Sequence, residues 1–185
     1  MNQQIPRPHF DGLDTAFLQL SFAMKLWHYV RQGSLPREEF DLALTIQEDN
    51  GSRYVMRHGE FKTDDDIVHA AGNNIAICFG AAAITLWVAI HECSRPEPGD
   101  LNPSASDEHG LAGLAYAMRC CFAHGTVLPK WQITEKYRIE YQIGGRRIDL
   151  RNVDGTTFDY AQVGGVDVLR GMWKQAIALG LLASG

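Results

Sequence analysis

Apolar residues in the first third of the chain recur at the three- and four-residue steps of an amphipathic helix. This spacing predicts a helix over 14–31, which Gly33 and Pro36 end. A shorter helix is predicted over 36–48, followed by a turn at Asp49-Asn50-Gly51, and the segment 52–61 fits no single element. The stripe of the first helix contains Leu13, Phe17, Leu20, Met24 and Trp27, and the second helix contains Phe40, Leu42, Leu44 and Ile46.

A long apolar stretch follows three consecutive aspartates, Asp64-Asp65-Asp66, which favour a helix start because the helix dipole attracts negative charge there. The predicted helix runs to about residue 93 and is apolar on nearly all sides, which places it at the centre of a bundle. Its uncharged run, 75–90, has sixteen residues, fewer than the about 20 that span a membrane. We therefore expect a core helix and no membrane partner. The proline-rich segment 94–106 is predicted to be a loop.

The second half of the chain combines one more helix with a two-residue alternation. Ser106 or Asp107 can cap a helix over 107–124, and Gly125 can end it. Beyond Pro129, apolar residues from Tyr137 to Ile143 alternate with polar ones, which is typical of a strand with one wet face. Gly144-Gly145 then predicts a hairpin turn. Asp154-Gly155 predicts a second turn before a last helix over 165–182.

These elements predict a mainly α fold, a helical bundle with a small antiparallel β-hairpin inserted before the last helix. The 185 residues suit a single domain over 1–185. We assign the core helices to 13–124, the hairpin segment to 125–162 and the C-terminal helix to 165–182.

The distribution of charge points to one end of the chain. The net charge of −5 argues against a broadly basic nucleic-acid surface. From Arg119 onward, however, there are nine Lys/Arg and six Asp/Glu, a balance of +3, and the remainder carries −8. An anionic ligand would therefore bind on the side of the C-terminal third.

Cysteine spacing and the first ten residues favour a reduced, cytoplasmic protein. The four cysteines form no C-x-x-C pair, and the first ten residues hold no apolar run. His91-Glu92 begins like a zinc-protease motif, but Arg95 stands where the second histidine would be. We expect no metal and no cofactor.

The helix over 107–124 carries two unlike faces. One is a core stripe. The other combines small residues with one tyrosine, one arginine and one histidine, which suits close packing against another helix, including the same helix of a second copy. The core stripe contains Leu111, Leu114, Ala115, Met118, Cys121 and Phe122, and the second face contains Ala112, Gly113, Tyr116, Arg119, Cys120, Ala123 and His124.

Arg119 and His124 on this face have the two abilities that metal-free RNA cleavage needs. A guanidinium group binds phosphate through its planar fork, and an imidazole takes and gives protons near neutral pH. In such a reaction a base removes the 2′-hydroxyl proton, a cation stabilises the crowded phosphorus, and an acid protonates the leaving oxygen. Tyr116 could stack on a base or a ribose.

The segment Arg119-Cys120-Cys121-Phe122-Ala123-His124 resembles the Arg-x4-His signature of the HEPN family (higher eukaryote and prokaryote nucleotide-binding). That signature closes a late helix of a four- or five-helix bundle. The resemblance covers about 14–124, and Pro129 and Trp131 resemble the Pro-x-Trp segment that follows the motif in bacterial HEPN-like proteins.

The resemblance implies Arg119 and His124 as catalytic residues and Tyr116 and Cys120 as substrate-binding ones. Many HEPN proteins are metal-independent endoribonucleases, and several are toxins or abortive-infection proteins. Many dimerise so that two motifs share one cleft. The implied partners are therefore RNA or a nucleotide, an antitoxin, and a second copy that pairs through the 107–124 helix.

Two other interpretations of the motif stay open. Family ribonucleases usually carry Asn or Asp directly after the arginine, and this chain has Cys120 there, which suits a non-catalytic dimeric binding module. Alternatively, Arg119 and His124 serve structure alone, as an ion-pair partner and a helix cap. Among the remaining polar groups, His69 and His91 are expected to be structural. The hairpin arginines are expected to be solvated, with anion binding as the alternative; these are Arg138, Arg146, Arg147 and Arg151.

Overall fold

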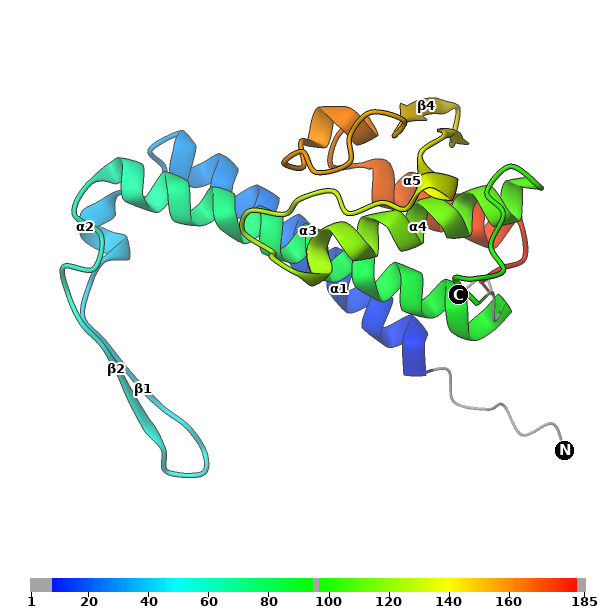
Figure 1. The fold of residues 1–185 in the computed structure, drawn as a ribbon. Coiled ribbons are helices and arrows are strands. Elements are labelled where there is room, and N and C mark those ends of the chain that lie inside the picture. Colours follow the sequence, from blue (N-terminus) through cyan, green and yellow to red (C-terminus); the bar gives the residue numbers. More distant parts are fainter. Residues whose placement is uncertain (1–7, 95–96, 183–185) are drawn as a thin grey trace, which may run out of the picture. The chain divides into compact units, whose positions relative to one another are not determined.

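The computed structural model describes residues 8–94 and 97–182, which fall into two compact units. Unit 1 consists of the described parts of Met1–Leu20 and Ala76–Gly185, and unit 2 of Ser21–Ile75. Two long helices, α1 (Pro8–Arg31) and α3 (Asp64–Ser94), contribute to both units (Figure 1). The two sheets are both two-stranded and antiparallel. The prediction of a mainly α chain with a small antiparallel hairpin before the last helix is confirmed.

Helix α3 begins at the three aspartates, as predicted, and extends over 31 residues. By length and composition it could cross a membrane, and it is the one described helix that could. In unit 1 its apolar side chains contribute to the core, since Phe79, Leu86 and Ile90 are completely buried. The predicted core helix is therefore present.

Aromatic rings of unit 1 gather around the half-buried ring of Phe158, which lies outside any helix or strand. Its centroid lies 4.9 Å from the ring of Phe122 on α4 (Asp107–Ala123) and 5.5 Å from that of Phe79 on α3. Trp131 and Tyr160 lie 5.4 and 5.3 Å from the same ring. The segment after α4 is thereby attached to both helices through aromatic contacts.

Helix α4 (Asp107–Ala123) packs on α3 at Gly80. A Cβ atom at Gly80 would lie 2.6 Å from Cδ1 of Phe122, so the ring rests directly on the α3 backbone. Ser106 caps the helix by accepting a hydrogen bond from the backbone N–H of His109. His124, rather than Gly125, is the C-terminal cap, and it keeps a helical conformation.

The C-terminal part of unit 1 contains five short elements: η1 (Glu135–Tyr137), β3 (Glu140–Ile143), β4 (Arg146–Asp149), η2 (Tyr160–Val163) and α5 (Val168–Ala178). Gly144 and Gly145 connect β3 to β4 with φ angles of 56° and 76°, as an Asn-Gly-type hairpin turn requires.

Two predicted boundaries in this region are wrong. The strand predicted from Tyr137 starts only at Glu140, because the preceding residues form a 3-10 turn. The last helix was expected over 165–182, but α5 is shorter at both ends. Gly165 (φ 101°) and Gly180 (φ 71°) have left-handed backbone conformations that a right-handed helix excludes.

Unit 2 has a small core of its own, in which Val30 of α1 meets Ile67 and Ala71 of α3. Its other elements are α2 (Arg37–Phe40), β1 (Leu44–Gln47) and β2 (Arg53–Met56). The helix predicted over 36–48 is therefore wrong beyond its first turn, since 44–47 pairs with 53–56 as a hairpin. The turn at Asp49-Asn50-Gly51 is confirmed and connects the two strands, with Gly51 at φ 85°.

A buried carboxylate fixes the base of this hairpin. Asp41 is the one polar or charged side chain that is buried among the described residues. Its oxygens accept hydrogen bonds from the backbone N–H groups of Gly59 (2.8 Å) and Glu60 (3.1 Å), across the open end of the hairpin. Because hydrogen bonds to a charged acceptor are stronger than neutral ones, these bonds hold the two ends of the hairpin together.

We predict that Gly80→Ala destabilises the chain, whereas Gly72→Ala on the same helix does not. The added methyl group at position 80 collides with the buried Phe122 ring and should lower the free energy of unfolding by about 1–3 kcal/mol. At Gly72 the nearest atoms are those of Trp27 at 3.7 Å, an ordinary contact, so the better helix propensity of alanine should dominate, by up to about 1 kcal/mol. Urea-induced unfolding of both variants measures the difference, and equal free energies would contradict the tight α3–α4 contact.

Candidate functional site

The second face of α4 is partly covered by the chain itself. Ala112 is buried, and a Cβ at Gly113 would lie 2.7 Å from Cγ of Pro103 and 3.5 Å from the Tyr137 ring. The small residues at the start of this face therefore admit the loop before α4 and the segment after it. The predicted close approach exists at Gly113, but what approaches is a loop and a 3-10 turn of the same chain and not another helix. The exposed residues of this face, Ala123 and His124, lie at the C-terminal end of the helix.

Arg119 lies half-buried on this face and forms no ion pair with a carboxylate in the described part of the chain. Its Nη1 lies 3.9 Å from Sγ of Cys120, a weak contact for a guanidinium group. Most of its five donors therefore remain available to a ligand.

Tyr116 connects the arginine to a row of aromatic rings. A hydrogen bond between its hydroxyl group and the Cys120 thiol raises the pKa of Tyr116, and burial adds to this shift. The Tyr116 ring meets Trp87 edge-on at 5.1 Å and lies 5.2 Å from Tyr137. Trp87 in turn stacks on His91 at 5.2 Å. We call these four rings, His91, Trp87, Tyr116 and Tyr137, the aromatic row.

The far end of the aromatic row is held by the loop before α4. The hydroxyl group of Tyr137 donates to the carbonyl oxygen of Pro98 at 2.7 Å, and Nζ of Lys136 donates to the same oxygen at 2.6 Å. The Lys136 ammonium group lies 5.0 Å from the centre of the Tyr137 ring. Burial raises the pKa of Tyr137 to about 12, with Tyr116 and Cys120 adding to the shift.

His124 stands at the exposed end of α4, outside the aromatic row. Exposed apolar side chains follow it, Val127 at 45% and Leu128 at 75% exposure. The structure thus brings Arg119, Cys120 and Tyr116 into one series of contacts and places His124 at the adjacent helix end. Pro129 and Trp131 have structural roles, since the Pro129 carbonyl accepts from the Phe158 N–H and Trp131 Nε1 donates to Gln162.

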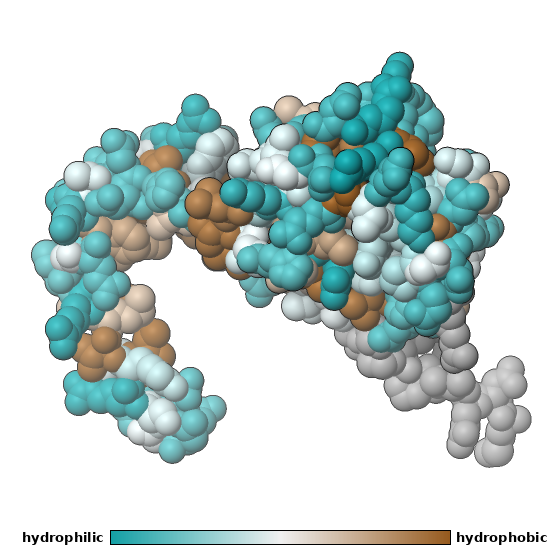
Figure 2. All heavy atoms as spheres, in the orientation of Figure 1, coloured by the Kyte–Doolittle hydropathy of each residue, from teal (hydrophilic) through white to brown (hydrophobic). Residues whose placement is uncertain are grey.

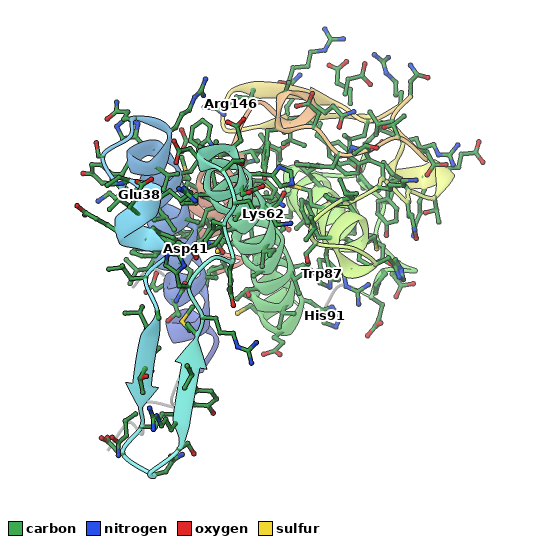
Figure 3. The ribbon with its side chains drawn as sticks, turned by 90° about the vertical axis from the view of Figure 1, so that its left-hand side faces the viewer. Glu38, Asp41, Lys62, Trp87, His91 and Arg146 are labelled. Atoms are coloured by element: carbon green, nitrogen blue, oxygen red, sulfur yellow. The ribbon has the colours of Figure 1, made fainter. Side chains whose placement is uncertain are left out.

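Two members of the aromatic row, Trp87 and His91, come from α3. The sequence pointed to His91 as a structural residue, but Trp87 was missed. Figure 3 shows Trp87 and His91 on the same stretch of α3. Their i,i+4 spacing could have indicated the stack. The contacts with Tyr116 depend on tertiary packing, which this spacing does not reveal.

The hairpin arginines are mostly engaged with carboxylates. Arg138 pairs with Asp154, and Arg151 pairs with Asp149, whose carboxylate it holds at a pKa well below the usual range. Arg147 lies 2.5 Å from Glu140. These three arginines form ion pairs on the surface of unit 1, so they are less available to an anion than Arg119 is.

A cationic pocket of about 250 Å³ lies between the β3–β4 turn and α5. Arg146, Arg170 and Lys174 line it together with one acid, Asp167. Arg146 also donates to the carbonyl oxygen of Gly164 at 2.6 Å. The positive excess of the C-terminal third is thus concentrated at this cationic pocket.

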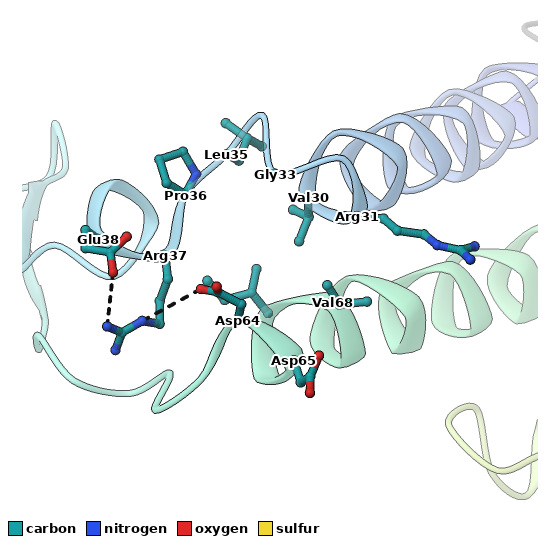
Figure 4. A pocket seen from close by; sticks show the side chains of 11 residues that line it. Val30, Arg31, Gly33, Leu35, Pro36, Arg37, Glu38, Asp64, Asp65 and Val68 are labelled. Atoms are coloured by element: carbon teal, nitrogen blue, oxygen red, sulfur yellow. Dashed lines mark hydrogen bonds and ion pairs between the residues drawn. The ribbon is translucent and has the colours of Figure 1, made fainter.

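Unit 2 contains a larger pocket of about 350 Å³ with the opposite character (Figure 4). Val30, Leu35 and Val68 give it apolar walls. At its rim Arg37 is bound to Glu38 (3.1 Å), lies 3.9 Å from Asp64 and donates to two backbone carbonyls. Arg37 is therefore occupied by the chain's own acceptors, and Arg31, the second arginine of the lining, lies over the Trp27 ring. Because Glu38, Asp64 and Asp65 also line it, the pocket is poorly suited to a phosphate. In the described residues no three His, Cys, Asp or Glu side chains gather as metal ligands do.

We predict that Tyr137→Phe makes the chain less sensitive to alkali. Because the pKa of Tyr137 rises from about 10 in the unfolded chain to about 12, folding favours its protonated form, and this stabilisation is lost as the pH rises from about 10 to about 12. The variant should also lose about 1 kcal/mol at neutral pH with its hydrogen bond to Pro98.

Urea unfolding at several pH values measures both effects, with Tyr29→Phe at an exposed position of α1 as the matched control. The variant should lose less stability than the wild-type chain between these pH values, while the control should follow the wild type. An unchanged pH dependence in Tyr137→Phe would contradict the buried position of this hydroxyl group.

Within the aromatic row Trp87 and Tyr137 are buried, so the half-buried ring of Tyr116 is the one that lies beside Arg119 and reaches the surface. A partly exposed aromatic ring beside an arginine is a combination by which proteins hold the bases and phosphates of single-stranded nucleic acids. Comparisons with models of protein families, with curated proteins and with solved structures found no match to this chain. The chemistry of this site is therefore argued from its own residues.

Proposed function

We propose that this chain is a HEPN-like protein that binds RNA and cleaves it without a metal ion. The proposal depends on the surroundings of Arg119. Its side chain is partly exposed beside the aromatic row, and its polar contact is with the Cys120 thiol. A guanidinium group in this state can accept a phosphate without first breaking an internal ion pair.

In the proposed reaction Arg119 holds the phosphate and His124 transfers the protons. His124 removes the proton of the 2′-hydroxyl group, the 2′-oxygen attacks phosphorus, and the bond to the 5′-oxygen breaks as that oxygen is protonated. The products are a 2′,3′-cyclic phosphate and a 5′-hydroxyl end. Tyr116 stacks on a base, and Cys120 contacts the substrate beside Arg119.

The cationic pocket supports RNA as the ligand. Its lining of three cations and one acid offers a second position for a phosphate within the same unit. A strand that passes Arg119 and this pocket would meet positive charge at both, although the whole chain is acidic.

The proposal includes a contact between two copies at the C-terminal end of α4. Ala123 and His124 are exposed there, and Val127 and Leu128 form an apolar border. A two-fold contact at this end would bring two Arg119–His124 pairs to one cleft. We further propose a cytoplasmic location and, as for other HEPN toxins, an antitoxin that covers the cleft.

The second candidate function is a non-catalytic binding module on the same fold. The position of Cys120 favours it, because its sulfur lies against Arg119 where the family's ribonucleases usually have Asn or Asp. This candidate keeps the ligand site and the contact between copies but has no cleavage activity. The substitution Cys120→Asn separates the two, since it should leave a pure binding module inactive.

We predict that the purified chain cleaves single-stranded RNA in the presence of EDTA, and that Arg119→Ala and His124→Ala each reduce the rate by about 100-fold or more. The 2′,3′-cyclic ends are detected by their resistance to end-labelling until they are opened. Arg147→Ala, which removes an exposed arginine already paired with Glu140, is the matched control and should cleave as the wild type does. Equal cleavage by all four proteins would exclude the enzymatic proposal.

We predict that Leu128→Glu lowers the cleavage rate because it places a charge in the proposed contact between α4 ends. Leu18→Glu is the control, since Leu18 is similarly exposed, at 71% against 75%, but lies on α1. Rates are compared at equal protein concentration, with circular dichroism to verify folding. If both variants cleave like the wild type, the α4 ends do not form the cleft.

A further inference from the structure

The hairpin of unit 2 has an apolar face that no other part of its unit covers. Leu44 and Met56 are directly paired across the strands, as are Ile46 and Tyr54. Alternate residues of a strand point to the same side, so these four side chains share one face. The opposite face carries Thr45, Gln47, Arg53 and Val55. We call residues 44–56 the arm and these four side chains the arm face. Their exposed fractions lie between 48% and 55%.

An isolated two-stranded hairpin is only marginally stable in water, and it becomes stable when one face packs on a second layer. All eight strand residues of the arm are exposed. Figure 2 shows hydrophobic residues of the arm at the molecular surface, and Figure 1 shows that the arm extends away from α2. Since Asp41 ties the two ends of the arm together, the arm is a closed hairpin, and the layer that would cover its face is external to its unit.

The charges of the arm indicate the chemistry of that second layer. The turn carries Glu48 and Asp49, whereas Arg57 and His58 follow β2 at the base. An acidic turn disfavours nucleic acid and anionic lipid surfaces. A second arm laid antiparallel on the first would place Glu48 and Asp49 of each turn beside Arg57 and His58 of the other copy.

The exposed area is consistent with such a pair. At roughly 100 Å² for each half-exposed side chain of this size, the arm face offers about 400 Å² per copy. The exposed side chains of Phe40 and Leu42 at the base bring the total to about 600 Å² per copy. Two copies then bury about 1,200 Å², the lower end of a standard stable interface.

We propose that the arm pairs with the arm of a second copy of this chain, face to face and turn to base. The product is a four-stranded sandwich of two hairpins, in which Leu44, Ile46, Tyr54 and Met56 of both copies form the buried layer. The contact is isologous, because the same surface serves both copies. This inference uses a surface separate from α4 and does not rest on the proposed ribonuclease.

The test measures the mass of the full chain by sedimentation equilibrium over a range of concentrations. Ile46→Glu introduces a charge into the proposed buried layer and should weaken association by about 30-fold or more. Gln47→Glu adds the same charge to the next residue, on the opposite face of the arm, and should associate like the wild type. Both positions are exposed in the single chain, so circular dichroism should show an unchanged fold.

A mixing experiment gives a second, independent readout. Ile46→Glu and Leu44→Lys should each be monomeric alone and should form a mixed dimer together, because turn-to-base pairing places residue 46 of one arm opposite residue 44 of the other. The proposal is overturned if the wild type has the mass of one copy, if Ile46→Glu associates like the wild type, if Gln47→Glu dissociates equally, or if the mixture stays monomeric.

The outcome is separable from that of the proposed function. Arg119→Ala and Leu128→Glu leave the arm intact and should therefore associate like the wild type, whatever their effect on RNA cleavage. If Leu128→Glu dissociates the dimer while Ile46→Glu does not, the copies pair through α4 and the arm proposal is wrong.

Discussion

The close packing of Phe122 on the backbone of α3 at Gly80 is the contact on which unit 1 depends. Because position 80 has no Cβ, the Phe122 ring can lie against the helix, and Phe158 then fills the space beside both. Phe158 positions Trp131 and Tyr160, and these residues hold the segments that lead to the hairpin and to α5. The same approach of α4 to α3 places Tyr116 against Trp87, so the aromatic row is a consequence of the core contact.

The helices α3 and α4 were predicted well, because each has a polar start followed by a long apolar segment. In α3 this segment is apolar on nearly all sides, and in α4 it forms one stripe. The segment 36–48 was misassigned although its apolar residues, Leu42, Leu44 and Ile46, alternate with a period of two. That period is the signature of a strand, and the partner strand 53–56 lay in the segment that fitted no single element. Pairing of 44–47 with 53–56 explains both segments as strands of one hairpin. This pairing depends on the Asp49-Asn50-Gly51 turn, which was predicted.

Several residues of the candidate site could be predicted from the sequence, but the contact partners of their side chains could not. The small residues Ala112 and Gly113 correctly indicated a close approach, yet the sequence does not show that Pro103 and Tyr137 of the same chain are what approaches. Likewise, the sequence alone does not distinguish Arg119 from Arg147. Only their surroundings distinguish an arginine beside a thiol from one beside a carboxylate, and this difference decides which can bind an anion.

The two proposed contacts between copies, at the α4 end and at the arm face, differ in size. We therefore expect them to have different roles. The α4 end offers few exposed apolar side chains, chiefly Val127 and Leu128, which is less than a stable interface needs. The arm face offers more area together with self-complementary charge. Once two arms pair, contact between the α4 ends no longer requires an encounter of free molecules, because tethering raises their effective concentration. A weak contact at His124 can then assemble a shared cleft, so the arm would supply the stability of the dimer and the α4 end its chemistry.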